Sequence, residues 1–148
     1  MKHAPLRGLR CLPRDSTGSS AGGSAANLAA NDNQYFSVQS PPNRITTWYG
    51  RFTGVPQSAT GLSVTYSGGN TVSCSQTVSI YRWSDAVWVQ LDARGVGTET
   101  LLNLTPPGAA SQYVSSTGEL RVQVYCRAPA GVKSYVTQGD LMSITYVG

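Results

Sequence analysis

Two segments of this 148-residue sequence combine aromatic rings with planar polar side chains. In TVSIYRWSDAVWVQLD, residues 77–92, three aromatic residues flank a Ser-Asp turn. In ELRVQVYCR, residues 119–127, polar and aromatic side chains alternate with aliphatic ones. Aromatic faces offer contact area at little entropic cost, and Arg and Gln offer fixed planar hydrogen bonds, a combination that suits a sugar ring. The candidate ligand-binding residues are Tyr81, Trp83, Trp88, Arg121, Gln123, Tyr125 and Arg127.

The alternation predicts which way these residues point. A hairpin closed within residues 83–86 places Tyr81 opposite Trp88 on one face of a sheet. On the other face, the expected pairs are Ile80 with Val89 and Val78 with Leu91. Burying a large aliphatic side chain is worth about 1.5–3 kcal/mol, so the aliphatic faces are expected to form the core and the aromatic faces the outside. Two alternatives stay open, because aromatic pairs stabilise sheets without a ligand and exposed Tyr, Trp and Arg also suit protein interfaces.

The cysteines at positions 74 and 126 share the inward side of their strands. Cys74 alternates in step with Val78 and Ile80, and Cys126 with Val124. This parity predicts a Cys74–Cys126 disulfide if the two strands are neighbours or face one another, which would imply an oxidising compartment. The alternative is two buried free cysteines, because Cys packs well as a small apolar side chain. Cys11 is expected to stay outside the domain.

Residues for catalysis are few. The chain has seven acidic residues, and most of them fall at expected strand ends or turns, where capping and solvation explain them. Glycoside hydrolysis needs two carboxylates that flank one bond, and acyl transfer needs a nucleophile beside a base. The single histidine, His3, lies in the first residues of the chain, so neither a His-based triad nor a zinc site is expected. The sequence therefore predicts that this is not an enzyme.

The elements that must position these residues are short strands. Only 12% of the residues are charged, and Gly, Ser, Thr, Pro and Tyr are plentiful, a composition typical of all-β proteins. Alternating runs separated by turn residues predict about eight strands of a sandwich or barrel. They span residues 34–40, 44–52, 62–66, 72–82, 87–91, 98–104 and 119–127, with a final pair at 134–136 and 141–147. Residues 1–24, which include STGSSAGGS, predict a flexible tail without core, and residues 25–148 the folded domain.

The net charge of +4 does not indicate nucleic-acid binding. Four basic residues precede the first acid, Asp15, and beyond them the charge is close to balanced. No stripe of Lys and Arg alternates with aromatics along a strand, so no nucleic-acid partner is expected. The sequence has no apolar run long enough for membrane insertion, and its basic start lacks the apolar stretch of a signal peptide.

Five blocks of the sequence carry a resemblance to a known kind of module. They are NLAANDNQYFSVQS, TTWYGRFTGV, SCSQTVSIYRWSDAVWVQLDARGVGTE, TPPGAASQYVSSTGELRVQVYCR and DLMSITY, and they run from about residue 27 to residue 146. They resemble the β-sandwich accessory domains of secreted multidomain bacterial proteins, of jelly-roll, galactose-binding-like or carbohydrate-binding-module character. The resemblance implies an antiparallel β-sandwich of jelly-roll type, an extracellular or cell-surface setting and a non-catalytic role. It transfers no catalytic residue.

The same resemblance implies a structural calcium ion near the chain ends, since similar modules often hold one there. The candidate ligands are Asn31, Asp32 and Asp140. Calcium takes six to eight oxygen ligands, including carboxylates and carbonyls, and three side chains supply only part of such a set. The alternative is that residues 31–33 form a plain turn before the first strand of the domain.

Two functions remain open at this point. The first is an extracellular binding or adhesion module that binds a glycan through its outer aromatic face. The second is a structural subunit or surface module of a filament, virion or cell-surface layer, which would self-associate through its tail and sheet edges. The aromatic face favours the first.

Overall fold

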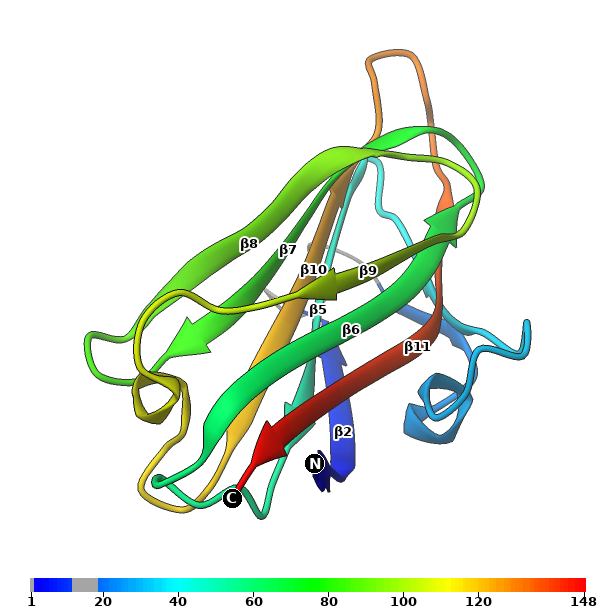
Figure 1. Ribbon diagram of the computed structural model, residues 1–148. Coiled ribbons are helices and arrows are strands. Elements are labelled where there is room, and N and C mark those ends of the chain that lie inside the picture. The colour runs from blue at the N-terminus through cyan, green and yellow to red at the C-terminus, as the bar shows by residue number, and fades with distance from the viewer. Residues whose placement is uncertain (1, 12–18) are drawn as a thin grey trace.

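Two antiparallel sheets stack as a β-sandwich in the computed structural model, which describes residues 2–11 and 19–148 (Figure 1). The first sheet has the order β3-β4-β11-β6-β9, and β1 also pairs with β11. Its strands are β1 (Lys2–Ala4), β3 (Ser19–Gly22), β4 (Phe36–Gln39), β6 (Thr60–Asn70), β9 (Thr100–Leu104) and β11 (Val136–Val147). The second sheet has the order β2-β5-β10-β7-β8. Its strands are β2 (Leu6–Cys11), β5 (Ile45–Phe52), β7 (Cys74–Arg82), β8 (Val87–Val96) and β10 (Leu120–Arg127).

The predicted all-β sandwich is confirmed, but the described residues form eleven strands instead of about eight. Each predicted strand corresponds to a strand of the structure, and the final pair is one continuous strand, β11. Gly139 and Asp140 suggested a turn, whereas the structure accommodates them as a register shift in the pairing of β11 with β6. Two short 3-10 helices, η1 (Ala25–Leu28) and η2 (Ala110–Tyr113), complete the described elements. Among the described residues, no helix has the length and apolar character that crossing a membrane requires.

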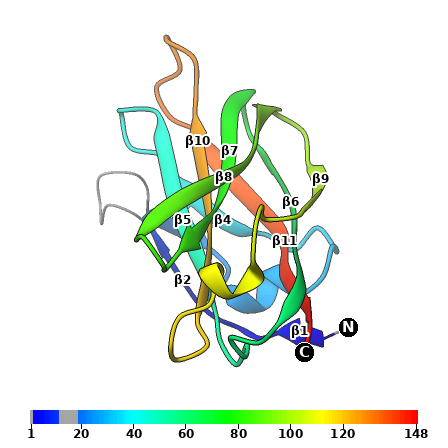
Figure 2. The same ribbon diagram turned by 60° about the vertical axis from the view of Figure 1, so that its left-hand side comes forward.

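The three additional strands lie in the segment that was predicted to be a flexible tail. β1 pairs with β11, β2 with β5 and β3 with β4, and Figure 2 shows β1 beside the end of β11. Ala4 is buried, and Leu6 and Leu9 pack against the core. The expectation that residues 1–24 carry no core is therefore wrong for the described part of this segment. Its basic and small residues suggested a linker, but the apolar residues between them add an edge strand beside β5.

The core lies between the sheets, and the residues of β7 and β10 that were predicted to face inward belong to it. Trp48 of β5 is fully buried, with its ring centroid 5.2 Å from that of Phe36 and 5.9 Å from that of Tyr66, both across the sandwich. The inward set of β10, predicted from alternation, is also fully buried; it comprises Leu120, Val122, Val124 and Cys126. Aliphatic residues of facing sheets thus meet as expected, and their burial stabilises the sandwich.

The hairpin of β7 and β8 follows the predicted register at its turn and departs from it further along. Ile80 pairs with Val89 and Tyr81 with Trp88, as predicted. Val78, however, pairs with Asp92 instead of Leu91, because the register shifts between Val78 and Ser79. Such a bulge places two residues of one strand opposite one of the other, so the alternation of β8 changes faces at this point.

The predicted disulfide is wrong. Cys74 and Cys126 are both buried and both free. In the pairing of β10 with β7, Cys126 lies opposite Gln76, two residues from Cys74, so the cysteines are diagonal neighbours. Diagonal neighbours keep their Cβ atoms about 7–8 Å apart, whereas a disulfide needs about 3.5–4.5 Å. The alternative of two buried free cysteines is the one that the structure shows.

Candidate functional site

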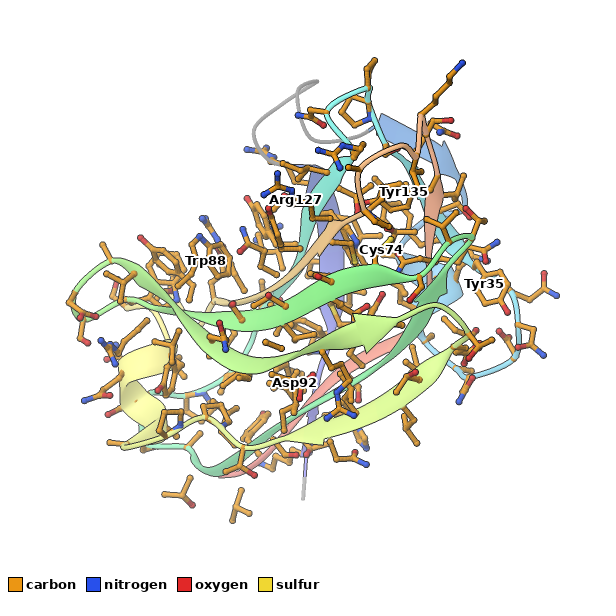
Figure 3. All side chains as sticks on the ribbon, turned by 90° about the horizontal axis from the view of Figure 1, so that it is seen from above. Tyr35, Cys74, Trp88, Asp92, Arg127 and Tyr135 are labelled. Carbon is orange, nitrogen blue, oxygen red and sulfur yellow. The ribbon has the colours of Figure 1, made fainter. Side chains whose placement is uncertain are left out.

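The seven candidate ligand-binding residues lie on the outer face of the second sheet or at its end. Along β10, Arg121, Gln123 and Tyr125 are half-buried and Arg127 is exposed, whereas the residues between them are fully buried. The register of β10 sets Gln123 between Tyr49 of β5 and Ser79 of β7. Figure 3 shows Trp88 and Arg127 on one side of β7 and β8, with Asp92 on the opposite side. Strand alternation therefore creates one outer face, as predicted.

The aromatic candidates contact one another at the turn end of this face. The ring centroid of Tyr81 is 4.8 Å from that of Trp83 and 5.1 Å from that of Trp88, and both pairs are edge-to-face. The ring of Tyr49 lies 6.0 Å from that of Trp88. Edge-to-face pairs are favourable because the positive edge of one ring meets the negative face of the other. These four rings form what is called here the aromatic cluster.

A loop contact fixes Trp83, which lies beyond the end of β7. Its backbone N–H donates to the carbonyl oxygen of Gln112 in η2, at 2.8 Å. This bond ties the turn between β7 and β8 to the loop between β9 and β10. The indole Nε1 of Trp83 is buried and has no hydrogen-bond partner among the described residues, whereas the residue as a whole is half-buried. The backbone hydrogen bond of Trp83 thus holds its indole ring at the margin of the aromatic cluster.

Arg121 joins the aromatic cluster to a carboxylate. Its guanidinium carbon lies 4.9 Å from the ring centroid of Trp83, 5.2 Å from that of Tyr49 and 5.9 Å from that of Tyr81. The Nε of Arg121 donates to Oε2 of Glu119 at 2.6 Å, and Nη1 of Arg51 donates to Oε1 of the same carboxylate at 3.2 Å. Cation–π contacts and the ion pair hold the guanidinium in one position. Arg121 is therefore an organising residue of this face as well as a candidate ligand group.

Two cavities flank Arg121. The first, called here the Trp83 cavity, has a volume of about 520 Å³ and is lined by Trp83, Glu119, Arg121 and several hydroxyl groups. The hydroxyls belong to Ser84, Ser111, Ser115, Ser116 and Thr117. The second, called here the arginine cavity, has a volume of about 290 Å³ and is lined by Gly8, Leu9, Arg10, Tyr49, Arg51 and Arg121. The Trp83 cavity opens beside the half-buried Trp83 and the arginine cavity beside the buried Tyr49, and both offer planar polar groups, the combination expected of a small-ligand site.

The seven candidate ligand-binding residues do not form one continuous contact cluster along the outer face. The structure brings Tyr81, Trp83, Trp88 and Arg121 together. Arg127 lies six positions after Arg121 along β10, and at about 3.4 Å per residue the two residues are about 20 Å apart. Arg127 lines a different cavity, of about 480 Å³, together with Arg44 and Cys74. Gln123 and Tyr125 occupy the stretch between the two ends.

The predicted calcium ligands do meet, around Asp140 of β11, an inner strand of the first sheet. Asp140 is fully buried, and its Oδ1 and Oδ2 accept the backbone N–H groups of Asp32 and Asn33 at 3.2 and 3.1 Å. With its side-chain amide oriented to satisfy its neighbours, Asn31 donates to Asp140 Oδ2 at 2.5 Å and to Glu99 Oε2 at 2.6 Å. Glu99 also accepts the hydroxyl of Ser67 at 2.6 Å.

These contacts are those of a hydrogen-bonded turn. Both oxygens of Asp140 already accept N–H donors, whereas calcium would require such oxygens as its own ligands. Within residues 2–11 and 19–148, no group of three or more His, Cys, Asp or Glu side chains is arranged to hold a metal ion. Asn31, Asp32, Asn33 and Asp140 are hydrogen-bonded to one another without an ion, and the calcium site stays a prediction.

Comparison with known proteins gives matches to solved structures alone: no family model and no curated protein matches this sequence. TmCBM61 in complex with β-1,4-galactotriose is similar with a TM-score of 0.55 at 9% identity, over 96% of this chain and 88% of that one. The CBM32 of AlyQ in complex with 4,5-unsaturated mannuronic acid gives 0.53 at 7% identity, over 98% of each chain. The N-terminal cellulose-binding domain of Cellulomonas fimi β-1,4-glucanase C gives 0.53 at 9% identity, over 95% of this chain and 90% of that one.

The chain has the β-sandwich fold of carbohydrate-binding modules. The resemblance that the sequence carries is thereby confirmed for the fold. In this β-sandwich, the aromatic cluster occupies the outer face of one sheet, and the Asn31–Asp140 contacts lie at β11, an inner strand of the other.

Three residues of the site were missed by the sequence analysis: Tyr49, Arg51 and Glu119. Tyr49 and Arg51 belong to ITTWYGRF, where buried residues follow one another and no alternation shows which of them face outward. Glu119 was assigned to a strand end, although it binds two arginines. The register of β5 against β10 would have identified Tyr49 and Arg51, because it sets Arg51 opposite Arg121 and Tyr49 opposite Gln123.

Proposed function

We propose that this protein is a non-catalytic, extracellular carbohydrate-binding module whose ligand lies against the aromatic cluster and the Trp83 cavity. The observation that carries the proposal is the position of Trp83. This half-buried residue lies beside a cavity that is lined by hydroxyl groups, Glu119 and Arg121. An aromatic ring covers the apolar side of a sugar, and planar donors and acceptors at its margin bind the hydroxyls.

The structural neighbours support this function. TmCBM61 is bound to β-1,4-galactotriose and the CBM32 of AlyQ to 4,5-unsaturated mannuronic acid, so sandwiches of this fold bind both a neutral and an acidic sugar. We propose that this chain binds a glycan in the same general role, as a module that attaches to a polysaccharide.

The chemistry of the cavity favours binding over hydrolysis. Glu119 is the one carboxylate that lines the Trp83 cavity among the described residues, and both of its oxygens pair with arginines. Both oxygens are thus engaged by the protein's own arginines, and hydrolysis needs a second carboxylate across the bond.

The test is a glycan array followed by calorimetry with the wild-type protein and the variants Trp83→Ala and Trp88→Ala. Retained fold is checked first by circular dichroism. Both variants are expected to lose most of the binding, whereas Leu101→Ala, an exposed residue of β9 in the other sheet, should keep it. Folded tryptophan variants that bind glycans as the wild type does would refute the proposed site. Large ordered particles in light scattering, without glycan binding, would instead favour the structural-subunit function.

A further inference from the structure

The arginine cavity brings together three positively charged side chains. Arg10 of β2, Arg51 of β5 and Arg121 of β10 line a single space of about 290 Å³. They come from three neighbouring strands, since β5 pairs with both β2 and β10. Three guanidinium groups around one small cavity repel one another, so their arrangement requires a compensating negative charge.

The described residues supply only part of this compensation. Glu119 pairs with Arg51 and Arg121, at 3.2 and 2.6 Å. The exposed Arg10 makes no ion pair with any described residue. Three positive charges and one negative charge leave an excess of two positive charges at the cavity. This excess is available to a ligand.

The backbone keeps the cavity open at its base. Gly8 pairs with Arg51, and a Cβ atom built on Gly8 would have no heavy atom within 4 Å. The space above Gly8 is therefore free, and the side chains of Arg10 and Arg51 flank it from two strands. On the other side, the ring of Tyr49 supports the guanidinium of Arg121 at 5.2 Å. The three guanidinium groups are thus held around the arginine cavity and do not fill it.

We propose that the arginine cavity binds the anionic group of an acidic glycan, a carboxylate or a sulfate. The proposal rests on the proposed glycan-binding function and specifies its ligand class. A guanidinium presents a planar fork of donors that matches a carboxylate or sulfate with two parallel hydrogen bonds. Arg121 lines both cavities. One glycan chain therefore lies across Arg121, with a sugar ring in the Trp83 cavity and a charged group in the arginine cavity.

The experiment compares polysaccharides that differ only in charge. Calorimetry of the full chain with polygalacturonate and with its methyl ester tests a carboxylate; carrageenan and desulfated carrageenan test a sulfate. At least ten-fold tighter binding of the charged member is expected in one of the two pairs, and the responding pair identifies the anion. The preference should weaken as salt is raised, because the ion pairs form at an exposed site.

Two variants link this preference to the cavity. Arg10→Gln is expected to reduce the preference for the charged polysaccharide at least three-fold and to leave binding of the neutral one unchanged. The control is Lys133→Gln, which removes the same charge from an exposed residue outside the cavity and should leave the preference intact. An equal effect of both variants would show that net charge, and not this cavity, causes the preference.

The remaining outcomes separate the two proposals. If the protein binds charged and neutral polysaccharides equally, and Arg10→Gln does so too, the acidic ligand is refuted while the glycan-binding function stands. If no polysaccharide binds, both proposals fail. If a single-stranded oligonucleotide binds as tightly as the acidic polysaccharide and loses this affinity in Arg10→Gln, the cavity is a phosphate site and the acidic glycan is refuted.

Discussion

The guanidinium carbon of Arg121 lies 4.9 Å from the ring centroid of Trp83, so a charged residue of β10 supports the indole that follows β7. The two residues come from adjacent strands, and Glu119 holds the same guanidinium through its Nε. The orientation of the candidate ligand-binding ring thus depends on an ion pair at the start of β10. This dependence leads to the first prediction.

Replacing Arg121 with Lys is expected to lower the free energy of unfolding by about 1–2 kcal/mol, although the charge is kept. Lys cannot stack a planar group over Trp83 and Tyr49, and such contacts are worth about 0.5–2 kcal/mol. Urea denaturation followed by tryptophan fluorescence measures the change. The matched control is Arg94→Lys, whose ion pair with Asp92 involves no ring, and which should change the stability clearly less than Arg121→Lys does. Equal stability of both variants would contradict the organising role of Arg121.

Asp140→Ala is expected to be among the most destabilising single changes in this chain. The variant removes the acceptor of the backbone N–H groups of Asp32 and Asn33 and a partner of Asn31. Asp140 itself is fully buried, and a typical intramolecular hydrogen bond contributes about 0.5–1.5 kcal/mol, so the loss of several bonds at one side chain adds up. Thermal unfolding should show a clearly lower melting temperature, and Asp32→Ala, which removes only an exposed acceptor of Gln34, should have a smaller effect. A melting temperature for Asp140→Ala that equals that of the wild type would show that these bonds do not stabilise the fold.

The predicted calcium ion can be tested at the same residues. If Asn31, Asp32 and Asp140 hold calcium, a chelator lowers the melting temperature of the wild type, and added calcium restores it. Asp140→Ala should then show no response to either reagent. A wild-type melting temperature that chelator leaves unchanged would end the calcium prediction and leave the hydrogen-bonded turn as the whole role of these residues.

Alternation was sufficient to predict which residues of β7 and β10 face the core. Aliphatic residues alternate with polar or aromatic ones along β10 and at the turn end of β7, so the pairing of Tyr81 with Trp88 followed from the turn alone. In β5, Trp48 and Tyr49 are adjacent, both are buried, and they point to opposite faces, so the pattern gave no direction. Tyr49 and Arg51 therefore entered the site only through the strand register.

Other misses arose from features that depend on pairing across strands. The bulge opposite Val78 is invisible in either strand by itself, and it decides whether Leu91 or Asp92 is the partner. The inward parity of Cys74 and Cys126 was correct, but their diagonal offset appears only once Cys126 is known to lie opposite Gln76. The N-terminal strands were missed because edge strands with few apolar residues gain their stability from the neighbour they pair with.

The two core thiols are expected to resist modification in the folded protein. Burial raises the pKa of Cys74 to about 11 and that of Cys126 to about 12. At pH 8, a pKa of about 11 leaves on the order of one thiol in a thousand as the reactive thiolate. Alkylation at pH 8 followed by peptide mass mapping should leave both residues unmodified, and alkylation in urea without reductant should modify both. A bridge between them, found as a linked peptide pair, would contradict the free thiols.

The same buried groups predict a loss of stability in alkaline solution. Burial raises the pKa of Cys74 to about 11, that of Cys126 to about 12 and those of Tyr66 and Tyr135 above their ordinary values. Because these pKa values are higher in the folded state, the unfolded chain releases its protons first. The stabilisation is complete below the unfolded thiol pKa of about 8.5 and is lost as the pH rises through the folded values.

The urea midpoint is therefore expected to be constant up to about pH 8 and to fall steadily between about pH 9 and 12. The two thiols dominate the beginning of this fall, because the unfolded tyrosine pKa is about 10. Cys126→Ala removes one of these titrating groups, so its midpoint should decline less between pH 8.5 and pH 10 than that of the wild type. The comparison uses slopes instead of absolute midpoints, since the substitution also changes core packing at every pH. Parallel slopes for the two proteins over this interval would show that the buried Cys126 thiol does not contribute to the alkaline loss.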